Sequence, residues 1–386
     1  MNVLLLGTSD SVFIRDFCLY VLDKKNINTV ILSPTLSKRY SRDYSGNRVK
    51  EIRWPDFFLK GIRRQAFAIP FINKEWHDLG DEIGFDNTID AIHVHYVEPL
   101  HLIYFFPFWK KSKKRILTFW GSDFFSATKK KLLLYPYFLK QSTSIVFMIQ
   151  NQCESFQQVF GHKYDDKIHV IDFGNSLLNV IDTVSQKYTV EECKRYFDLP
   201  TDKLVVHIGY NASRAQQHIE LLKRIVILPD DILKRLILVF HISYGTFRDC
   251  EAYRKKMEKI MNIVKLDYRF IDTYLQGEEL AMFRRTCDIF IYGQKTDARS
   301  ASPLEYIYAG AKFICPGWLA DNYELLNEAQ IKYYVYSDFE QLPGVVENCI
   351  KETTLPREGL SDMSRKRIRD EISWDSLAEK WRRLYE

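Results

Sequence analysis

Short apolar runs alternate with longer amphipathic segments along most of the chain. Continuous apolar strands separated by helices are typical of parallel sheets that are covered on both faces. The pattern therefore predicts an α/β protein. The runs that we expect to be strands are 3–6, 29–32, 91–94, 116–119, 144–149 and 168–171 in the first half, and 204–208, 236–241, 268–271, 289–292 and 312–315 in the second.

The segment Asp172–Ser176 separates these two series of strands. At roughly 100–200 residues per domain, a chain of 386 residues is long enough for more than one core. We expect two Rossmann-like, doubly wound parallel-sheet domains that face a cleft, over residues 1–175 and 176–370. Ligands of open α/β sheets bind beyond the carboxyl ends of the strands, so the loops that follow the strands are the places to look for function.

The seven cysteines are widely spread and form no CxxC pair. This is typical of reduced thiols in a cytoplasmic protein and argues against a zinc site. The amino-terminal sequence lacks the basic segment and the long apolar run of a signal peptide. The longest uncharged aromatic stretches, 102–109 and 132–139, are too short to span a bilayer. We expect a cytoplasmic protein that meets a membrane only at its surface.

Several well-known motifs are absent from the sequence, among them GxGxxG, the Walker-type GxxxxGK[ST] and DxD. Their absence argues against a nicotinamide dehydrogenase, a P-loop NTPase and a transferase that holds its metal with DxD. His93 and His95 lie on one face of a predicted strand, but no third ligand is near them in the sequence. A hydrogen-bonded pair is the commoner case, so we expect no bound metal and no cofactor.

The strongest local signal is the loop Asp297–Glu305. Ser302 is a good N-cap, so a helix is expected to begin there and to run through Ala309. The backbone amides of Ala301 and Ser302 would then form an anion site suited to a phosphate. Glu305, one turn into the helix, can accept hydrogen bonds from two ribose hydroxyls. The alternative is an ordinary capped helix with a solvated glutamate.

A second arrangement of this kind, Gly209–Arg214, follows the predicted strand 204–208. Gly209 permits a ligand to approach the backbone, Ser213 can cap the next helix, and Arg214 can neutralise a diphosphate. A nucleotide diphosphate needs several donors that converge on it. Two such helix starts in one domain therefore favour a nucleotide site.

Polar side chains also follow two predicted strands of the first half. His95 and Asp123 would reach the same edge of the sheet, where an imidazole and a carboxylate can position an acceptor hydroxyl or take its proton. The alternative is that Asp123 caps the following helix and His95 bonds to the backbone.

Taken in order along nearly the whole chain, these motifs resemble those of a GT-B-fold glycosyltransferase, and the second half is similar to glycosyltransferase family 4. The family has two acidic residues eight positions apart, and they correspond to Asp297 and Glu305. At the first of these positions the family has Glu. Tyr210 falls where the family has an arginine, and Trp120 replaces the histidine of its HGxD turn. A weaker resemblance, through Trp120–Asp123 and Gly209–Ser213, is to bacterial 4-acetamido-4,6-dideoxygalactose transferases, and it favours assembly of a surface polysaccharide.

The resemblance implies metal-independent sugar transfer, with retention, from a nucleotide-diphosphate donor on the C-terminal domain to an acceptor on the N-terminal domain. It also implies that residues 371–386 form a helix that packs back on the N-terminal domain. The catalytic residues would be His95 and Asp123, and the acceptor-binding residues Gly7, Thr8 and Trp120. The donor-binding residues would be Gly209, Asn211, Ser213, Arg214, Thr273, Tyr274, Asp297, Ala301, Ser302 and Glu305.

The formal charge of +5 is an average over unlike parts, because residues 38–64 hold nine Lys/Arg against three Asp/Glu and residues 110–131 hold eight against one. Aromatic residues are interleaved with the basic ones in 54–64 and 104–115, a pattern that suits an anionic membrane surface and a lipid-linked acceptor. The alternative is a solvated basic face over core aromatics. Two other functions remain open, a nucleotide-sugar 2-epimerase on the same fold and a non-catalytic nucleic-acid-binding protein.

Overall fold

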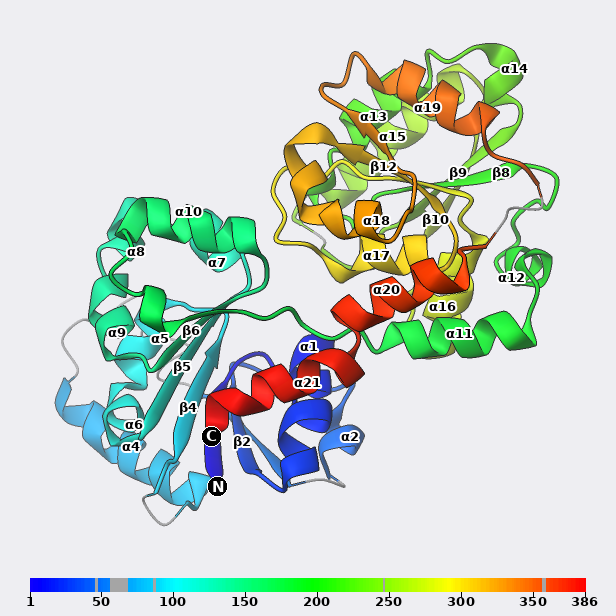
Figure 1. The fold of residues 1–386 in the computed structure, drawn as a ribbon. Helices are drawn as coiled ribbons and strands as arrows, with labels where there is room; N and C mark the ends of the chain where they lie inside the picture. Colours follow the sequence, from blue (N-terminus) through cyan, green and yellow to red (C-terminus); the bar gives the residue numbers. More distant parts are fainter. Residues whose placement is uncertain (46–47, 56–68, 86–87, 246, 356–358) are drawn as a thin grey trace. The chain divides into compact units, whose positions relative to one another are not determined.

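The computed structural model describes residues 1–45, 48–55, 69–85, 88–245, 247–355 and 359–386. The chain divides into two compact units (Figure 1). The first unit consists of Met1–Gly174 and Ile372–Glu386, and the second of Asn175–Glu371. We refer to Ile372–Glu386 as the closing segment. Because it belongs to the first unit, both ends of the chain lie in that unit. Each unit is built on a parallel sheet covered by helices, which confirms the predicted two-domain α/β fold.

The sheet of the first unit has seven parallel strands in the order β3-β2-β1-β4-β5-β6-β7. The order reverses direction between β1 and β4, as in Rossmann folds, so the loops after these two strands lie at the position where such sheets bind ligands. The strands are β1 (Asn2–Leu6), β2 (Asn28–Ser33), β3 (Val49–Arg53), β4 (Ala91–His95), β5 (Lys114–Phe119), β6 (Ser144–Phe147) and β7 (Ile168–Val170).

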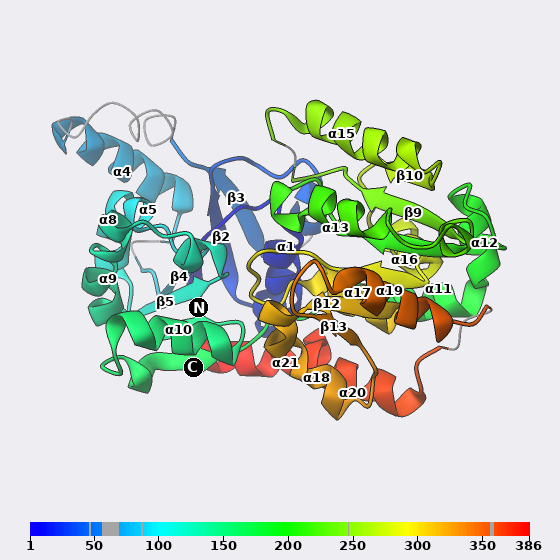
Figure 2. The same ribbon diagram turned by 90° about the horizontal axis from the view of Figure 1, so that it is seen from above.

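Helices cover both faces of this sheet (Figure 2). Alternate strand residues, such as Leu4 and Val94, pack against α4, α5, α6, α9 and α10, while their neighbours face α1 and α21. The helical segments are α1 (Val12–Phe17), η1 (Cys18–Leu22), η2 (Asp23–Lys25), α2 (Ser41–Ser45), α4 (Ile69–Ile83), α5 (Pro99–Tyr104), α6 (Phe106–Lys111), α7 (Ser122–Phe125), α8 (Lys129–Leu132), α9 (Tyr135–Gln141), α10 (Gln150–Phe160), η3 (Asp165–Lys167), α21 (Trp374–Arg382) and η6 (Arg383–Tyr385).

The closing segment is held in the first unit by specific contacts. Trp381 Nε1 donates a hydrogen bond to the carbonyl of Asp172 at 2.9 Å, and the ring of Trp374 stacks on Tyr20 with centroids 5.6 Å apart. A Cβ at Gly174 would lie 2.2 Å from the ring of Trp374, so only glycine fits there. The contact of helix α21 with the sheet therefore depends on a residue at the boundary between the units.

The sheet of the second unit has six parallel strands in the order β10-β9-β8-β11-β12-β13, and its order reverses between β8 and β11. Helices α13, α15 and α19 cover one face and α16 and α17 the other (Figure 1). The strands are β8 (Leu204–Ile208), β9 (Leu236–His241), β10 (Asp267–Ile271), β11 (Ile289–Ile291), β12 (Lys312–Pro316) and β13 (Tyr334–Tyr336). The helical segments are α11 (Leu177–Lys187), α12 (Val190–Tyr196), η4 (Arg214–Gln216), α13 (His218–Ile225), α14 (Asp230–Leu233), α15 (Cys250–Ile263), α16 (Gly277–Thr286), α17 (Ala301–Tyr308), η5 (Gly317–Tyr323), α18 (Glu324–Glu328), α19 (Leu342–Lys351) and α20 (Asp362–Ile372).

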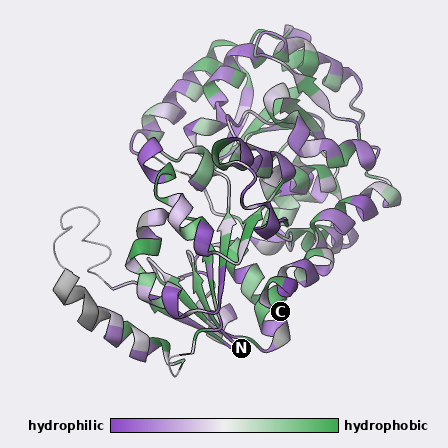
Figure 3. Cartoon of the chain, turned by 60° about the vertical axis from the view of Figure 1, so that its left-hand side comes forward, coloured by the Kyte–Doolittle hydropathy of each residue, from purple (hydrophilic) through white to green (hydrophobic). Residues whose placement is uncertain are grey.

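The distribution of hydropathy follows this layering. Most helices carry both hydrophobic and hydrophilic residues, as expected when one face packs on a sheet and the other meets solvent (Figure 3). Three central strands of the second sheet, β8, β9 and β11, are buried along their whole length. Within the described residues, no helix has the length and apolar character needed to cross a bilayer.

Candidate functional site

The loop after β8 lies at the point where the strand order of the second unit reverses, and it begins with Gly209. This residue has a φ of 64°. A Cβ there would lie 2.7 Å from Nε2 of His218 and 2.9 Å from Oε1 of Gln216. Glycine is therefore required both by the backbone conformation and by the space that is left.

Asn211 and Ser213 shape the rest of this loop. The side-chain oxygen of Asn211 accepts a hydrogen bond from the backbone N–H of Ser213 at 2.9 Å. The hydroxyl of Ser213 accepts one from the N–H of Ala215 at 3.2 Å and so caps η4, a single turn. The expectation of one continuous helix after this cap is wrong, because Gln217 has a φ of 55° and separates η4 from α13.

Arg214 points away from this network into solvent, with 61% of its side chain exposed. Its guanidinium lies 4.4 Å from the centroid of the Phe247 ring and 3.7 Å from a carboxylate oxygen of Asp249. Arg214 also lines a cavity of about 460 Å³ together with Lys256 and Lys295. The side chain is thus accessible to an anion and is accompanied by two further cations.

Asp297 organises the loop after β11, the neighbouring strand at the same reversal point. Its carboxylate accepts hydrogen bonds from the hydroxyl of Tyr292 at 2.7 Å and from the backbone N–H and hydroxyl of Ser300 at 2.8 and 2.7 Å. The hydroxyl of Tyr210 in turn donates to Ser300 Oγ at 2.9 Å. Burial raises the pKa of Asp297. These contacts fix the loop that leads into α17, and whether Asp297 also touches a donor stays a prediction.

The helix that follows this loop begins earlier than the sequence predicted. Ser300 is the N-cap of α17, so Ser302 is not the cap but lies in the first turn, next to Ala301. Proline favours the first positions of a helix, and Pro303 made Ser302 resemble the N-cap, two residues after the actual one. The first-turn amides of a helix have no partner within it, so Ala301 and Ser302 still lie where an anion could bind, and the anion site itself stays a prediction.

Glu305 is almost fully buried and paired, with 8% of the residue exposed. One carboxylate oxygen lies 3.0 Å from Nε of Arg284, and the other accepts a hydrogen bond from the side-chain amide of Asn175 at 3.3 Å. The expectation of a solvated glutamate in the alternative interpretation is therefore wrong. A ribose contact by Glu305 stays a prediction, and it would have to share the carboxylate with these two partners.

Arg284 is the central residue of this region that the sequence analysis missed. It is 2% exposed, its Nη2 donates to Ser302 Oγ at 3.1 Å, and its guanidinium stacks 4.2 Å from the centroid of the Tyr306 ring. Within the described residues, its Nη1 has no hydrogen-bond partner. The available signal was that Arg284 directly follows the apolar run Ala281–Phe283 in the segment that forms α16.

Thr273 and Tyr274 lie after β10, beside the end of β9. The carbonyl oxygen of Thr273 is 3.3 Å from Nε2 of His241, and the ring of Tyr274 lies 6.1 Å from that of Tyr244. Burial lowers the pKa of His241 to about 3, so its imidazole is neutral near pH 7. The structure thus gives these two residues protein partners at the carboxyl edge of the sheet, and their contact with a base stays a prediction.

His95 ends β4, at the reversal point of the first sheet. It is 2% exposed, and within the described residues neither ring nitrogen has a hydrogen-bond partner. The rings of Phe17 and Phe173 lie 4.8 and 5.7 Å away. Burial lowers the pKa of His95 to about 3. The neighbouring His93 is hydrogen-bonded to Tyr385 and Thr118, which matches the packed-pair interpretation of the two histidines.

Asp123 is also buried, but its carboxylate is fully engaged. It accepts backbone N–H groups from Val97 at 2.8 Å and from Trp120 and Gly121 at 3.0 and 2.9 Å, and a fourth from Phe124 at 3.1 Å. Burial raises the pKa of Asp123 to about 6, against the opposing effect of these bonds. The contacts match the capping interpretation, and a catalytic role stays a prediction.

The three residues expected to bind an acceptor fall in the same region of the first unit. A Cβ at Gly7 would lie 3.0 Å from Cδ1 of Ile14 and 3.5 Å from Cβ of His95. Thr8 follows Gly7 and is exposed. The ring of Trp120 lies 6.1 Å from that of His95 and 5.4 Å from that of Phe173. The structure therefore brings Gly7, His95 and Trp120 together.

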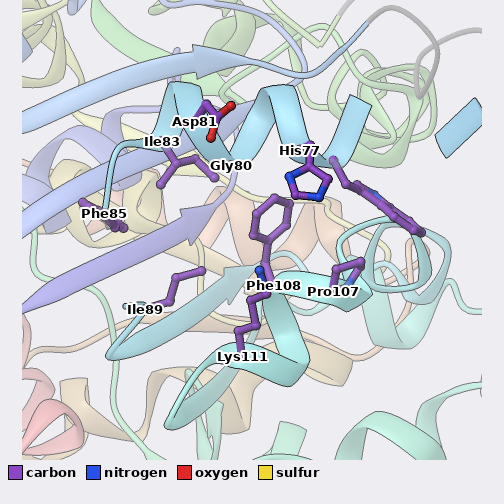
Figure 4. A pocket seen from close by; sticks show the side chains of 10 residues that line it. His77, Gly80, Asp81, Ile83, Phe85, Ile89, Pro107, Phe108 and Lys111 are labelled. Atoms are coloured by element: carbon purple, nitrogen blue, oxygen red, sulfur yellow. The ribbon is translucent and has the colours of Figure 1, made fainter. Parts of the chain in front are cut away.

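A separate cavity of about 400 Å³ lies between α4 and α6 (Figure 4). It is lined by apolar residues such as Phe108 and Ile89, with Asp81 and Lys111 among them. Ile89 precedes β4 and Lys111 precedes β5, so the cavity lies at the amino ends of the strands, opposite to the edge where such sheets bind ligands. None of the predicted site residues lines it. Among the described residues, no group of three His, Cys, Asp or Glu is placed to hold a metal.

Comparisons with known proteins give the class of this chain. Residues 2–151 match the model of the glycosyl transferase 4-like family, and no curated protein matches the chain. A glycosyltransferase from Rickettsia africae superposes with a TM-score of 0.74 and 15% identity, over 100% of this chain and 97% of that one. A sucrose-phosphate synthase from Thermosynechococcus elongatus gives a TM-score of 0.73 and 13% identity, over 100% and 98%.

HepE of Anabaena, solved in complex with UDP-glucose, is also similar, with a TM-score of 0.68 and 11% identity over 98% of both chains. At these identities the structural likenesses establish the fold, which is the GT-B fold. The match of residues 2–151 to the glycosyl transferase 4-like family supports a glycosyltransferase.

Proposed function

We propose that the enzyme transfers a sugar from a nucleoside-diphosphate donor bound by the second unit to a lipid-linked saccharide bound by the first. The observation that carries the donor site is Arg284, a buried cation bonded to the first turn of α17 and to Glu305, with one guanidinium nitrogen free of protein partners among the described residues. A helix start backed by a buried guanidinium suits a diphosphate. The complex of HepE with UDP-glucose supports a nucleotide sugar as the donor.

In the proposed reaction the acceptor hydroxyl attacks the anomeric carbon, and the bond from that carbon to the diphosphate oxygen breaks. Negative charge grows on the diphosphate, where the amides of α17, Arg284 and Arg214 would stabilise it. These groups supply the positive charge that a metal ion provides elsewhere, so we propose a metal-independent reaction.

The proton of the acceptor hydroxyl needs a destination. His95 has a pKa of about 3, which makes it a weak base near pH 7, and the carboxylate of Asp123 is occupied by backbone N–H groups. We therefore propose that His95 accepts a hydrogen bond from the acceptor and that the proton leaves with the diphosphate. Transfer on one face of the sugar, with retention, is compatible with this route.

The biological setting proposed is surface-polysaccharide assembly at the inner face of a bacterial membrane, with the enzyme peripheral to it. It is supported by the basic surface of the first unit described below. The weaker resemblance to 4-acetamido-4,6-dideoxygalactose transferases points in the same direction and stays a prediction.

Calorimetric titration with UDP, GDP and dTDP tests the donor site. We expect one nucleotide to bind, and Arg214→Ala and Ser302→Ala to weaken it about tenfold each, since each removes one donor to a charged phosphate. Arg269→Ala is the matched control, because Arg269 also makes an exposed ion pair with an aspartate, Asp198, which precedes β8 and so lies toward the amino end of that strand, opposite to the loop Gly209–Arg214. Unchanged affinity in both site variants would overturn the assignment. Turnover that EDTA abolishes and Mg²⁺ restores would overturn the metal-independent route.

A further inference from the structure

The aromatic residues that the sequence analysis assigned to a membrane surface are mostly in the core. Phe105, Phe108 and Trp109 are at most 5% exposed and pack in the core of the first unit, and Trp54 is 5% exposed. The rest of the segment 56–64 lies outside the described residues. The expectation that the rings sit at a membrane interface is therefore wrong for these four, whereas Tyr104 and Phe106 are only partly buried.

Another segment of the same unit does expose apolar side chains. Leu133 is 79% exposed, Tyr137 52% and Leu134 36%. Leu133 and Leu134 have helical backbone angles and connect α8 to α9, so residues 129–141 are nearly one continuous helix. Exposed apolar side chains that gather in one patch, rather than singly, point to an interaction surface.

The spacing along this helix arranges the exposed residues in a stripe. Lys129, Leu133, Tyr137 and Lys140 are separated by four, four and three residues, so they lie on one face. All four are exposed. The stripe therefore has an apolar centre with a lysine at each end. We refer to these four residues together with Lys130 and Leu134 as the α8–α9 surface.

Neighbouring helices extend the α8–α9 surface with the same chemistry. The ring of Phe106 on α6 lies 5.9 Å from that of Tyr137, and Nζ of Lys110 lies 5.0 Å from the centroid of the Phe106 ring. Ile103 on α5 is 46% exposed. Apolar side chains and lysines thus alternate across three helices.

The charge around this surface is mainly positive. Residues 99–143 contain nine Lys/Arg and a single acidic residue, Asp123, which is buried. Lys131 pairs with Glu98, but Lys129 and Lys130 make no ion pair among the described residues. An anionic surface is therefore the electrostatic complement, and it attracts each nearby lysine by about 1 kcal/mol.

We propose that the α8–α9 surface docks the enzyme on an anionic lipid bilayer, with Leu133 and Leu134 entering the interface and the lysines contacting phosphate headgroups. Exposed leucines distinguish a bilayer from a nucleic acid, because aliphatic side chains gain nothing from a phosphate backbone, whereas burial in acyl chains stabilises them. The purpose of this contact rests on the proposed lipid-linked acceptor. The contact itself does not depend on the nucleotide site.

The test is co-sedimentation of the full chain with vesicles of phosphatidylcholine, with and without phosphatidylglycerol. We expect binding only when phosphatidylglycerol is present, and weaker binding at high salt. Leu133→Ser with Leu134→Ser should weaken binding about tenfold or more. Lys129→Glu with Lys130→Glu should abolish it. All four residues are exposed, so melting temperature and nucleotide affinity should not change.

Matched controls come from the second unit. Ile263 is 74% exposed at the end of α15, and Lys255 and Lys259 are exposed on the same helix. Ile263→Ser, and Lys255→Glu with Lys259→Glu, should bind vesicles like the wild type. Wild-type vesicle binding by the Leu133/Leu134 variant would overturn the proposal. Binding to single-stranded RNA but not to vesicles, or self-association that this variant abolishes without any vesicle binding, would overturn it too.

The two proposals can fail separately. Vesicle binding is measured without nucleotide, and nucleotide binding without vesicles. If the wild type binds nucleotide but no vesicles, the proposal of a docking surface is wrong and the donor site stands. If it binds vesicles but no nucleotide, the donor site is wrong and the docking surface stands.

Discussion

The two units share one sheet design but use buried polar residues differently. In the second unit, Arg284, Glu305, Ser302 and Asn175 form one connected network, in which both oxygens of the carboxylate have a partner. In the first unit, His95 is buried with no hydrogen-bond partner among the described residues, and Asp123 binds only backbone N–H groups. The comparison teaches that both units place polar residues at the reversal of strand order, whereas a buried cation paired with a carboxylate is found there, among the described residues, in the second unit alone.

This difference matters because an unpaired buried charge lowers the free energy of unfolding strongly. The imidazole of His95 is neutral near pH 7 and needs no charged partner. The second unit can keep a permanent cation at its sheet edge because Glu305 balances it. At the edge of the first unit His95 is neutral and the carboxylate of Asp123 is held by backbone N–H groups, while lysines lie on the outside, on the α8–α9 surface. A charged diphosphate and a neutral acceptor hydroxyl are the ligands that these two edges respectively suit.

The largest expected effect breaks the network of the second unit. Arg284→Leu leaves the carboxylate of Glu305 buried with a single amide partner, which should cost about 3–5 kcal/mol in free energy of unfolding. The double variant Arg284→Leu with Glu305→Leu removes both charges and should recover most of that loss. Urea denaturation followed by circular dichroism measures both.

The double variant is the control that separates two explanations. If each variant simply lost packing, the two losses in free energy of unfolding would add in the double variant. If the loss in Arg284→Leu came from an unpaired buried carboxylate, they would not add. A double variant as unstable as the sum of the singles would show that the pair is not the unit of stability. The comparison between the two sheet edges would then lose its basis.

A smaller effect is expected from the cap of the first unit. Asp123→Ala removes the acceptor of four backbone N–H groups, and we expect a loss of about 2–3 kcal/mol. Asp165→Ala, at an exposed site of the same unit, should change the unfolding free energy by less than about 0.5 kcal/mol. Full stability with lost turnover in Asp123→Ala would instead restore the catalytic interpretation of this carboxylate.

Much of the fold followed from the apolar runs, because central strands of parallel sheets are continuously buried. All eleven predicted strands overlap strands of the structure, and β8 and β9 coincide with them. The two missed strands, β3 and β13, are edge strands. Exposed residues interrupt both of them, for example Lys50 in β3 and Val335 in β13. The exposed residues break the apolar run in these two strands, whereas the other two edge strands, β7 and β10, kept enough apolar residues to be predicted.

The candidate site was predictable where a local rule applies and not where partners are distant in sequence. Gly209 and, to within two residues, the start of α17 were found from turn and capping preferences. Arg284 meets Glu305 across 21 residues, and Asn175 meets it across 130. Their contacts depend on the packing of α16 and of the boundary segment on α17, which no periodicity encodes. The same reason explains why Asp123 could not be told from a cap in the sequence.

The smallest expected effect is the pH dependence contributed by His95. Its pKa is about 3 in the folded state, below its value of about 6.5 in an unfolded chain. Between these values the unfolded state binds a proton that the folded state does not, so stability is complete above pH 6.5 and is lost as the pH falls. At pH 5.5 the loss should be about 1 kcal/mol.

A difference measurement isolates this contribution from that of Asp123, whose raised pKa acts in the opposite direction and is present in both proteins. His95→Gln does not titrate, so its unfolding free energy should fall less than that of the wild type between pH 7.5 and 5.5, by about 1 kcal/mol. His77→Gln, at an exposed position on α4, should follow the wild type. An identical pH dependence in wild type and His95→Gln would mean that His95 reaches a proton in the folded state. The sheet edge of the first unit would then hold a buried cation as the second unit does, and the contrast between the two would disappear.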